Sequence, residues 1–399
     1  MHEIPKSPLR SSTYPRPWFR RRPAFWLVTF LAVFLLFHFG GGWYFSGEIY
    51  SSALKPSPST FDFDIPVLAI GGGTVTLSTV DGPSELETPG VWGLAWADGY
   101  GRLTELVATD DESAEWRLES SSPVLPETGA LVDLDGRTFA GDPMEAHGIG
   151  FTDVTYRSSL GDNPAWFIEG DAGTWVVLVH GNGLTRRDML KPLPVIVANG
   201  NPALVITYRN DPPAPADPSG RLQYGLTEWE DLEAAVDYAL TAGADDVVLV
   251  GYSMGGGIVV NFLYESPLAA RVRGVVLDSP MLDLGAAVDL GASNRSLPVI
   301  GLPIPSTLTA TAKLMAGLIY DLDWGRLDYL DRADEIQVPV LLFHGVADDI
   351  VPVETSDALA EMLSGLVSYH RVESAKHLES WNLDPATYEK LLGEFLAGL

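Results

Sequence analysis

The chain has 399 residues, a hydrophobic fraction of 46% and a formal net charge of −28. That hydrophobic fraction is ample for a folded core and excludes a globally disordered chain. The length predicts one large domain or two. The absence of cysteine excludes disulfides, thiolate zinc sites and cysteine nucleophiles. Basic residues are concentrated at the N-terminus, so the remaining body is strongly acidic and should repel nucleic acid, which we do not expect as a partner.

The N-terminus combines a basic tail with an apolar run. Residues 1–22 hold six Lys and Arg side chains against a single acid, and residues 23–45 carry no formal charge. As a helix, Ala24–Phe45 would be about 33 Å long, which is enough to span the hydrocarbon core of a bilayer. The positive-inside rule keeps residues 1–22 in the cytoplasm. The sequence therefore predicts a single-pass protein of the cell membrane, with a transmembrane helix at 23–45 and an extracytoplasmic body.

Two other interpretations of this apolar run stay open. A cleaved signal peptide would use Ser51-Ser52-Ala53 as its cleavage site and release a secreted protein, although the apolar run is longer than is usual in signal peptides. A buried helix of a soluble domain is the second alternative, and the arginines directly before the run argue against it.

Residues 46–150 contain no long periodic segment. Residues 46–60, with Pro56 and Pro58 among serines, are typical of a linker. From 61 to 150, short alternating apolar runs are broken by glycine, proline and aspartate, which predicts a small β-rich module. Its expected strands are Thr74–Val80, Val91–Ala95, Glu115–Leu118 and Leu131–Leu134.

From residue 151 to 399, strand-like runs alternate with helical ones. Continuous apolar strands separated by helices predict an α/β domain with a mainly parallel central sheet and helices on both faces. The expected strands are Trp175–Val179, Ala203–Thr207, Val247–Val250, Gly274–Leu277, Val338–Phe343 and Val367–Val372, and the expected helices are Glu228–Leu240, one from Gly257 and Ala386–Ala397. In such sheets, sites form at the carboxyl ends of the strands.

Residues 283–334 interrupt this alternation. They form apolar, helix-like pieces punctuated by glycine and proline, such as Ser306–Tyr320. An insertion of this length is often a lid over a site, so we expect a helical lid here. A structural excursion without a gating role is the alternative.

The strand Val247–Val250 leads into Gly251-Tyr252-Ser253-Met254-Gly255, which fits the pattern of a nucleophile elbow. In that corner a serine hydroxyl is exposed in a strained turn, and Gly251 and Gly255 are needed because side chains there would collide. A helix that starts at the serine points N–H groups and a positive dipole end at a developing oxyanion. The pentapeptide alone is weak evidence, and the flanking strand and helix strengthen the prediction that Ser253 is a nucleophile.

A serine nucleophile needs a base to remove its proton, and the base needs an acid to orient it. Asp348 follows the strand Val338–Phe343, and His377 follows the strand Val367–Val372. The chain order Ser253, Asp348, His377 is the one expected for a catalytic triad on this kind of sheet. Asp348 is preferred as the acid for its spacing after Gly345, and the adjacent Asp349 is the second choice.

The strand Trp175–Val179 ends in His180-Gly181-Asn182-Gly183. A glycine-rich loop at a strand end can turn a backbone N–H toward the serine, and the N–H of Met254 supplies a second donor. Together they would form an oxyanion hole. A flexible turn without this role is the alternative.

Taken together, these pieces resemble the α/β-hydrolase superfamily, specifically single-pass or secreted serine hydrolases with an HGN-type oxyanion loop. The resemblance covers about residues 150–399. It rests on His180–Gly183, Thr207–Asp211, Gly251–Gly256, Asp278–Pro280, His344–Pro352, and His377 with Ser380–Asn382. It implies that the backbone amides of Asn182 and Met254 form the oxyanion hole, with His180, Gly181, Gly251 and Gly255 in supporting positions. A serine where haloalkane dehalogenases carry aspartate argues against dehalogenation, and no metal or organic cofactor is implied.

We therefore expect a membrane-anchored serine hydrolase that cleaves a small-molecule or lipid-like acyl ester through an acyl-enzyme, as carboxylesterases and lipases do. Thioesterase, peptidase and acyltransferase reactions use the same triad and stay open, because a fold does not determine the substrate. A non-enzymatic binding or scaffolding protein, with the β-rich module as its contact surface, is the last alternative. The intact set of Ser253, Asp348 and His377 argues against it.

Overall fold

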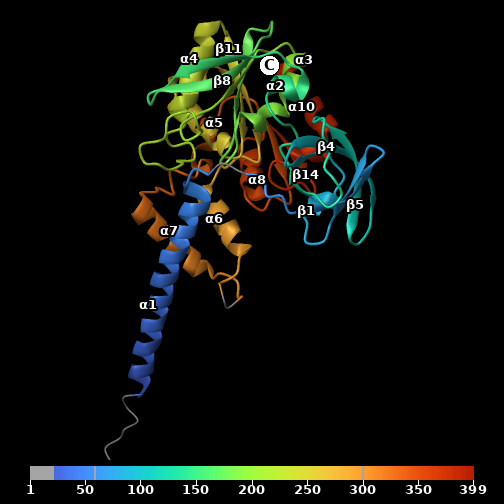
Figure 1. Ribbon diagram of the computed structural model, residues 1–399. Helices are drawn as coiled ribbons and strands as arrows, with labels where there is room; N and C mark the ends of the chain where they lie inside the picture. Colours follow the sequence, from blue (N-terminus) through green and yellow to red (C-terminus); the bar gives the residue numbers. More distant parts are fainter. Residues whose placement is uncertain (1–21, 58–59, 299–300) are drawn as a thin grey trace, which may run out of the picture.

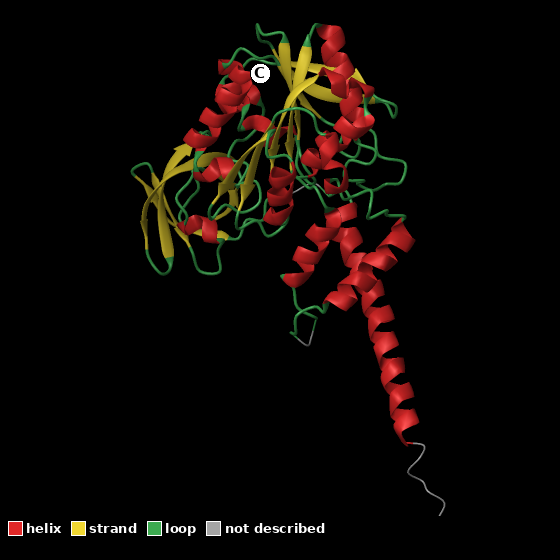
Figure 2. Cartoon of the chain, turned by 180° about the vertical axis from the view of Figure 1, so that it is seen from behind, coloured by secondary structure: helices red, strands yellow, loops and turns green. Residues whose placement is uncertain are grey.

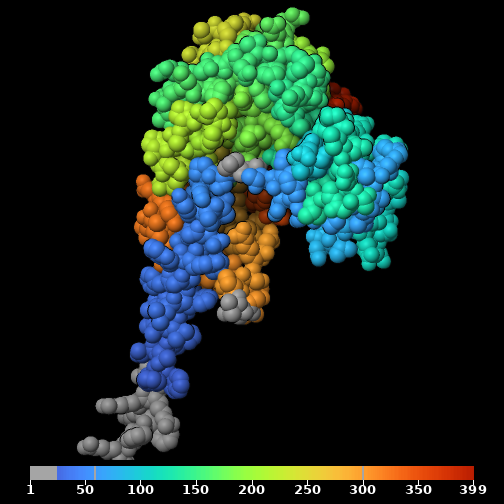
Figure 3. Space-filling view, in the orientation of Figure 1, coloured from blue at the N-terminus to red at the C-terminus, as the bar shows by residue number. Residues whose placement is uncertain are grey.

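The computed structural model describes residues 22–57, 60–298 and 301–399 of the chain (Figure 1). The expected basic tail at 1–22 lies outside the described residues except for Arg22. A long N-terminal helix leads away from a large α/β body, and a small barrel forms a lobe at the side of that body (Figures 1 and 3).

The N-terminal helix α1 spans Arg22–Ile49 and continues into a π-helical segment, η2, at Tyr50–Leu54. Its first half is apolar and exposed, as Phe25, Trp26 and Leu36 illustrate with exposed fractions of 63%, 66% and 74%. Within the described residues, one helix is long and apolar enough to cross a membrane, and it is this one. A signal sequence near an N-terminus meets the same criteria.

The structure differs from the linker expected at residues 46–60. The helical segment continues to Leu54, and Ile49 and Leu54 are buried in the apolar core of the α/β body. The carbonyl of Leu54 accepts a hydrogen bond of 2.8 Å from the N–H of Leu222. Burial of these apolar side chains outweighs the loop preference of the serines among them, so the extended chain begins at Lys55.

The residues expected to be β-rich form a closed six-stranded barrel, which confirms that part of the prediction. Its strands pair in the order β1-β2-β5-β4-β3-β6, and all the pairs are antiparallel. The strands are β1 Ile65–Gly71, β2 Thr74–Ser78, β3 Trp92–Trp96, β4 Gly99–Thr109, β5 Ser113–Ser120 and β6 Leu131–Asp135, with a short 3-10 turn, η3, at Ser84–Glu87. Trp92 and Trp116 are fully buried in its core. Closure leaves no unpaired sheet edge.

The body contains an eight-stranded sheet in the order β14-β13-β12-β11-β9-β10-β8-β7. The pairs between β7 and β8 and between β8 and β10 are antiparallel, and all the others are parallel, so the predicted mainly parallel sheet is confirmed. The strands are β7 Thr152–Arg157, β8 Asp162–Ile168, β9 Thr174–Val179, β10 Ala203–Ile206, β11 Asp246–Tyr252, β12 Val272–Asp278, β13 Val340–Gly345 and β14 Val367–Val372.

Helices cover both faces of this sheet (Figure 2). Along β9, Val177 and Val179 belong to the core beneath α4 (Trp229–Ala242) and α5 (Met254–Glu265), whereas Val176 and Leu178 belong to the core beneath α3 (Leu193–Ala198) and α10 (Pro385–Gly398). Alternate side chains are therefore buried on opposite faces, which is why the strand sequences are continuously apolar. The helices are α2 Pro143–His147, α3 Leu193–Ala198, α4 Trp229–Ala242, α5 Met254–Glu265, α8 Val353–Met362, α9 Ser380–Leu383 and α10 Pro385–Gly398, with 3-10 turns η4 Arg186–Leu190, η5 Pro267–Arg271 and η6 Leu330–Glu335.

The expected lid region, 283–334, contributes two helices between β12 and β13. They are α6 Leu284–Ser293 and α7 Ser306–Tyr320. Both lie at the end of the body from which α1 emerges (Figures 1 and 2). The imidazole Nε2 of His38 in α1 lies 3.1 Å from the hydroxyl of Thr307 in α7, so the lid region and the N-terminal helix are in direct contact.

Candidate active site

Ser253 occupies the corner between β11 and α5. Its backbone has φ +52° and ψ −120°, a conformation that non-glycine residues rarely adopt and that is typical of strained functional turns. A Cβ atom at Gly251 would lie 2.7 Å from the carbonyl oxygen of Gly255, and one at Gly255 would lie 2.2 Å from that of Val179. These contacts are the collisions that the sequence led us to expect. The helix begins at Met254, earlier than the expected start at Gly257.

His377 lies between Ser253 and Asp348. Its Nε2 is 2.9 Å from Oγ of Ser253, and its Nδ1 is 2.7 Å from Oδ2 of Asp348. When Nδ1–H donates to the carboxylate, Nε2 is left as the acceptor for the serine hydroxyl. The loops after β13 and β14 bring these side chains together with Ser253, although they are far apart in the sequence. This arrangement suits a serine that is deprotonated by a neighbouring imidazole.

The carboxylate of Asp348 is fully buried and held from several sides. Its Oδ1 accepts hydrogen bonds from the N–H groups of Ile350 and Val351, at 2.9 and 2.8 Å. Burial alone would raise the pKa of Asp348, but hydrogen bonds with His344 and His377 hold it well below its usual range. The group therefore stays ionised. Asp349, the alternative acid, is exposed, and within the described residues its side chain makes no hydrogen bond or ion pair with His377.

His344 is a neighbour of Asp348 that the sequence analysis did not single out. It is the second-last residue of β13, is completely buried, and its Nε2 lies 3.2 Å from Oδ2 of Asp348. Its Nδ1 lies 2.7 Å from the hydroxyl of Ser356 in α8, which fixes the ring. A histidine at the end of the strand that precedes the acid was the available signal. His344 thus links the Asp348 carboxylate to α8.

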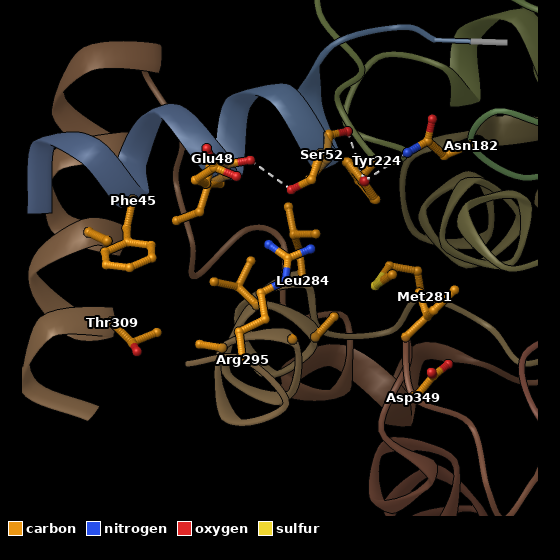
Figure 4. Close-up of a pocket in the computed structure, with 18 of the residues that line it drawn as sticks. Phe45, Glu48, Ser52, Asn182, Tyr224, Met281, Leu284, Arg295, Thr309 and Asp349 are labelled. Atoms are coloured by element: carbon orange, nitrogen blue, oxygen red, sulfur yellow. Dashed lines mark hydrogen bonds between the residues drawn. The ribbon is translucent and has the colours of Figure 1, made fainter. Parts of the chain in front are cut away.

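The loop His180–Gly183 after β9 lies directly against Ser253. A Cβ atom at Gly181 would be 2.9 Å from Cβ of Ser253, so only glycine permits this approach. Within the described residues, the backbone N–H groups of Asn182 and Met254 donate to no acceptor. The Asn182 side chain donates to the hydroxyl of Tyr224 at 3.3 Å, so the loop is tied to the body (Figure 4).

His180 faces away from the serine. Its ring stacks on Tyr208 at a centroid distance of 4.6 Å, and its Nε2 lies 2.9 Å from Oδ2 of Asp211. Burial favours the neutral ring, but the hydrogen bond with the Asp211 carboxylate outweighs it and raises the pKa of His180. The residue therefore supports the loop without reaching the reacting atoms.

A buried lysine lies beneath the His377 loop. Lys191 Nζ donates to the carbonyl of Leu378 at 3.2 Å and to Oδ1 of Asn382 at 2.6 Å. Burial lowers the pKa of Lys191 to about 8. Burial also raises the pKa of nearby Asp278 to about 6. Sequence patterns gave no indication that Lys191 and Asp278 lie close together, because Lys191 lies in an irregular segment far from Asp278 in the chain.

The barrel contacts the loop that carries His377. Nδ2 of Asn382 lies 2.8 and 3.0 Å from the carbonyl oxygens of Val91 and Gly136 and 2.9 Å from Oγ1 of Thr138, and its two N–H groups are shared among these acceptors. On the other side of the histidine, Lys376 Nζ lies 2.7 Å from Oε1 of Glu85. Residues of the barrel module therefore form polar contacts with the chain both before and after His377.

A cavity of about 400 Å³ opens beside Ser253 and His377 (Figure 4). Its lining is mainly apolar, with Leu284 and Val288 from α6, and it also reaches Asn182. A cavity of this size and polarity suits a small organic ligand. No group of three or more His, Asp or Glu side chains that could hold a metal ion occurs in the part of the chain that the structure describes.

Comparison with known proteins assigns the family. The profile of the alpha/beta hydrolase family matches residues 176–391, just over half of the chain. The chain belongs to the alpha/beta hydrolase family. The α/β-hydrolase fold predicted from the sequence is thereby confirmed.

The relatives of this hydrolase are distant. It is 25% identical to the uncharacterized protein YfhR of Salmonella typhimurium over 241 residues, 56% of this chain and 72% of that protein. It is 35% identical to the uncharacterized protein YqkD of Bacillus subtilis over 63 residues, 16% of this chain and 21% of that protein. The solved structure of the esterase PF2001 of Pyrococcus furiosus matches with a TM-score of 0.52 at 20% identity, covering 65% of this chain and 95% of that one. That likeness shows a shared fold.

Proposed function

We propose that this hydrolase cleaves acyl esters, with Ser253 as nucleophile, His377 as general base and Asp348 as the orienting acid. The observation that supports this most strongly is the hydrogen-bonded chain from Ser253 through His377 to Asp348, at 2.9 and 2.7 Å. The name of the solved neighbour, an esterase, favours an ester over other acyl compounds.

In the proposed reaction, His377 Nε2 takes the proton of Ser253 as Oγ attacks the acyl carbonyl. The ionised Asp348 stabilises the imidazolium that forms. The N–H groups of Asn182 and Met254, which have no acceptor among the described residues, would bind the oxyanion. His377 then protonates the leaving alcohol, and water, deprotonated by the same imidazole, releases the acid from the acyl-enzyme.

We also propose that α1 is an uncleaved membrane anchor that places the catalytic domain outside the cytoplasm. Cleavage after Ala53 would remove Ile49, which is 7% exposed in the core of the body. Burying such a side chain stabilises a fold by about 1.5–3 kcal/mol. Mass spectrometry of the mature N-terminus tests this, and a chain that starts at Leu54 would refute it.

The experiment that tests catalysis is labelling of the full-length protein in detergent with a fluorophosphonate, mapped by peptide mass spectrometry. We expect label on Ser253 and none in Ser253→Ala or His377→Ala. Asp348→Asn should lower kcat for ester hydrolysis by about 10⁴-fold, because the imidazole loses its orienting partner. Asp349→Asn should cost far less, and Asp237→Asn, at an exposed position in α4, is the matched control. Absence of label on a folded protein would favour the scaffolding alternative.

A further inference from the structure

The cavity beside Ser253 has a wall made by the N-terminal helix. The residues of α1 and η2 that line it are Phe45, Glu48, Ile49, Ser52 and Ala53. Figure 4 shows Phe45, Glu48 and Ser52 along one side of the space, with Leu284 and Arg295 on the other side. The helix that is apolar and exposed over its first half thus borders, with its last turns, the space that contains Ser253.

The same end of α1 is connected to the loop beside the serine. The hydroxyl of Tyr224 donates to the carbonyl of Ala53 at 2.9 Å and accepts from Nδ2 of Asn182 at 3.3 Å (Figure 4). The end of the N-terminal segment and the proposed oxyanion loop therefore share one tyrosine. A segment that served only as a tether would not need these contacts.

Helix α7 follows α1 at close range. A Cβ atom at Gly42 would lie 2.8 Å from Cγ2 of Thr311, so glycine is required for this approach. The rings of Tyr50 and Tyr320 stack at a centroid distance of 5.0 Å. If α1 spans a bilayer, α7 packs beside the C-terminal turns of α1 and therefore lies at the boundary between the acyl chains and the headgroups.

The lid region exposes several large apolar side chains. Leu314 and Leu318 of α7 are 63% and 79% exposed, and Leu302 in the preceding loop is 58% exposed. Leu314 and Leu318 lie one turn apart on the same face of α7, and exposed leucines beside an apolar helix are typical of a surface that contacts lipid. Inside, the cavity is mainly apolar, but Glu48 and Arg295 give it charged groups that suit the headgroup of an amphiphile.

We infer that the protein takes an acyl-ester lipid directly from the bilayer, and that α1 is part of the substrate site as well as the anchor. This inference rests on the proposed hydrolase function. The acyl chain passes between α1, α6 and α7 into the cavity, and the ester reaches Ser253. Hydrolysis breaks the acyl C–O bond, and water supplies a hydroxyl to the fatty acid and a proton to the lipid alcohol.

The first test fills the cavity. A Cβ atom at Gly291 of α6 meets nothing within 4 Å, and this residue lines the cavity, so Gly291→Leu extends a side chain into it without a backbone clash. The ratio of kcat/KM for p-nitrophenyl dodecanoate to that for p-nitrophenyl acetate should fall by about tenfold or more. The reason is that the leucine side chain occupies space in the cavity that several methylene groups of the dodecanoyl chain would otherwise fill. Gly47→Leu, on α1 but outside the cavity and equally free of contacts, is the matched control and should leave this ratio unchanged.

The second test concerns entry from the bilayer. Leu318→Asp places a charge on the lipid-facing surface, and the rate on phosphatidylcholine vesicles containing monooleoylglycerol should fall by about tenfold. Hydrolysis of p-nitrophenyl acetate should be unaffected, since Leu318 does not line the cavity. Met362→Asp, at another exposed apolar helical position, 58% exposed in α8, is the control.

The outcomes separate this inference from the function on which it rests. If the parent protein hydrolyses both esters but Gly291→Leu keeps the dodecanoyl-to-acetyl ratio, the cavity is not the acyl site. If Leu318→Asp keeps the vesicle rate, the substrate does not arrive past α7. Either result overturns the inference and leaves the hydrolase function intact. A parent protein that hydrolyses neither ester and takes no fluorophosphonate label would refute the proposed function itself.

Discussion

Asn382 is the residue whose loss should do most damage to the link between the barrel and the His377 loop. It is completely buried, accepts a hydrogen bond from Lys191, and donates to Val91 and Gly136 in the barrel segment. Asn382→Ala leaves these buried groups short of a partner. At about 1–3 kcal/mol for each of these three buried polar groups, the free energy of unfolding should fall by about 3–9 kcal/mol.

The measurement is urea unfolding of the full-length protein in detergent, followed by circular dichroism, together with kcat for p-nitrophenyl acetate. Asn199→Ala is the control, since the Asn199 side chain is only partly buried and donates a single hydrogen bond, of 2.7 Å, to Asn201. It should cost about 1 kcal/mol or less. We expect kcat to fall in Asn382→Ala alone, because the loop that holds His377 loses its support.

The reasoning would be refuted by an Asn382→Ala protein whose free energy of unfolding lies within about 1 kcal/mol of the control value. A loss of stability without any change in kcat would refute the narrower idea that the barrel positions His377.

Two further predictions concern the elbow and the buried charges. Gly255→Ala should abolish ester hydrolysis and lower the melting temperature, because its Cβ would lie 2.2 Å from a carbonyl oxygen of β9, whereas Gly398→Ala in α10 meets nothing within 4 Å and should be neutral by thermal denaturation. Asp278 has its folded pKa raised to about 6, so the folded state binds more protons than the unfolded chain between about pH 4 and 6, and the stability that this group contributes is lost as pH rises through that window. Asp278→Asn should remove this loss from a series of urea denaturations across the window, and a variant with the parent's pH dependence would contradict the assignment.

Local sequence patterns were sufficient for the elements around the serine. The run Asp246–Tyr252 is apolar enough to be buried on both faces, and the glycines that follow leave room for a single kind of turn. Since parallel strands end at the same edge of the sheet, polar residues placed just after β11, β13 and β14 could be expected to meet. In the structure, His377 lies within hydrogen-bonding distance of both Ser253 and Asp348.

The tertiary structure was needed to show which of Asp348 and Asp349 lies within hydrogen-bonding distance of His377. The two residues are adjacent and chemically identical, so no periodicity distinguishes them. The N–H groups of Ile350 and Val351 hold the Asp348 carboxylate in place, and His344 approaches it from the end of β13. These contacts depend on how the loop folds back on itself.

Contacts between segments distant in the chain were also beyond the sequence. Nothing local to Asn382 or Lys191 indicates that they meet each other and the barrel, and the serines around residue 52 suggested a linker where a helical segment lines the cavity. The fold class, the strand–turn–helix corner at Ser253 and the chain order of Ser253, Asp348 and His377 were readable from local patterns, because they follow from strand periodicity and from the steric limits of a tight turn. The contacts that support those three residues, and the walls of the cavity, became visible in the folded chain alone, because burial and hydrogen bonding there join segments that share no sequence pattern.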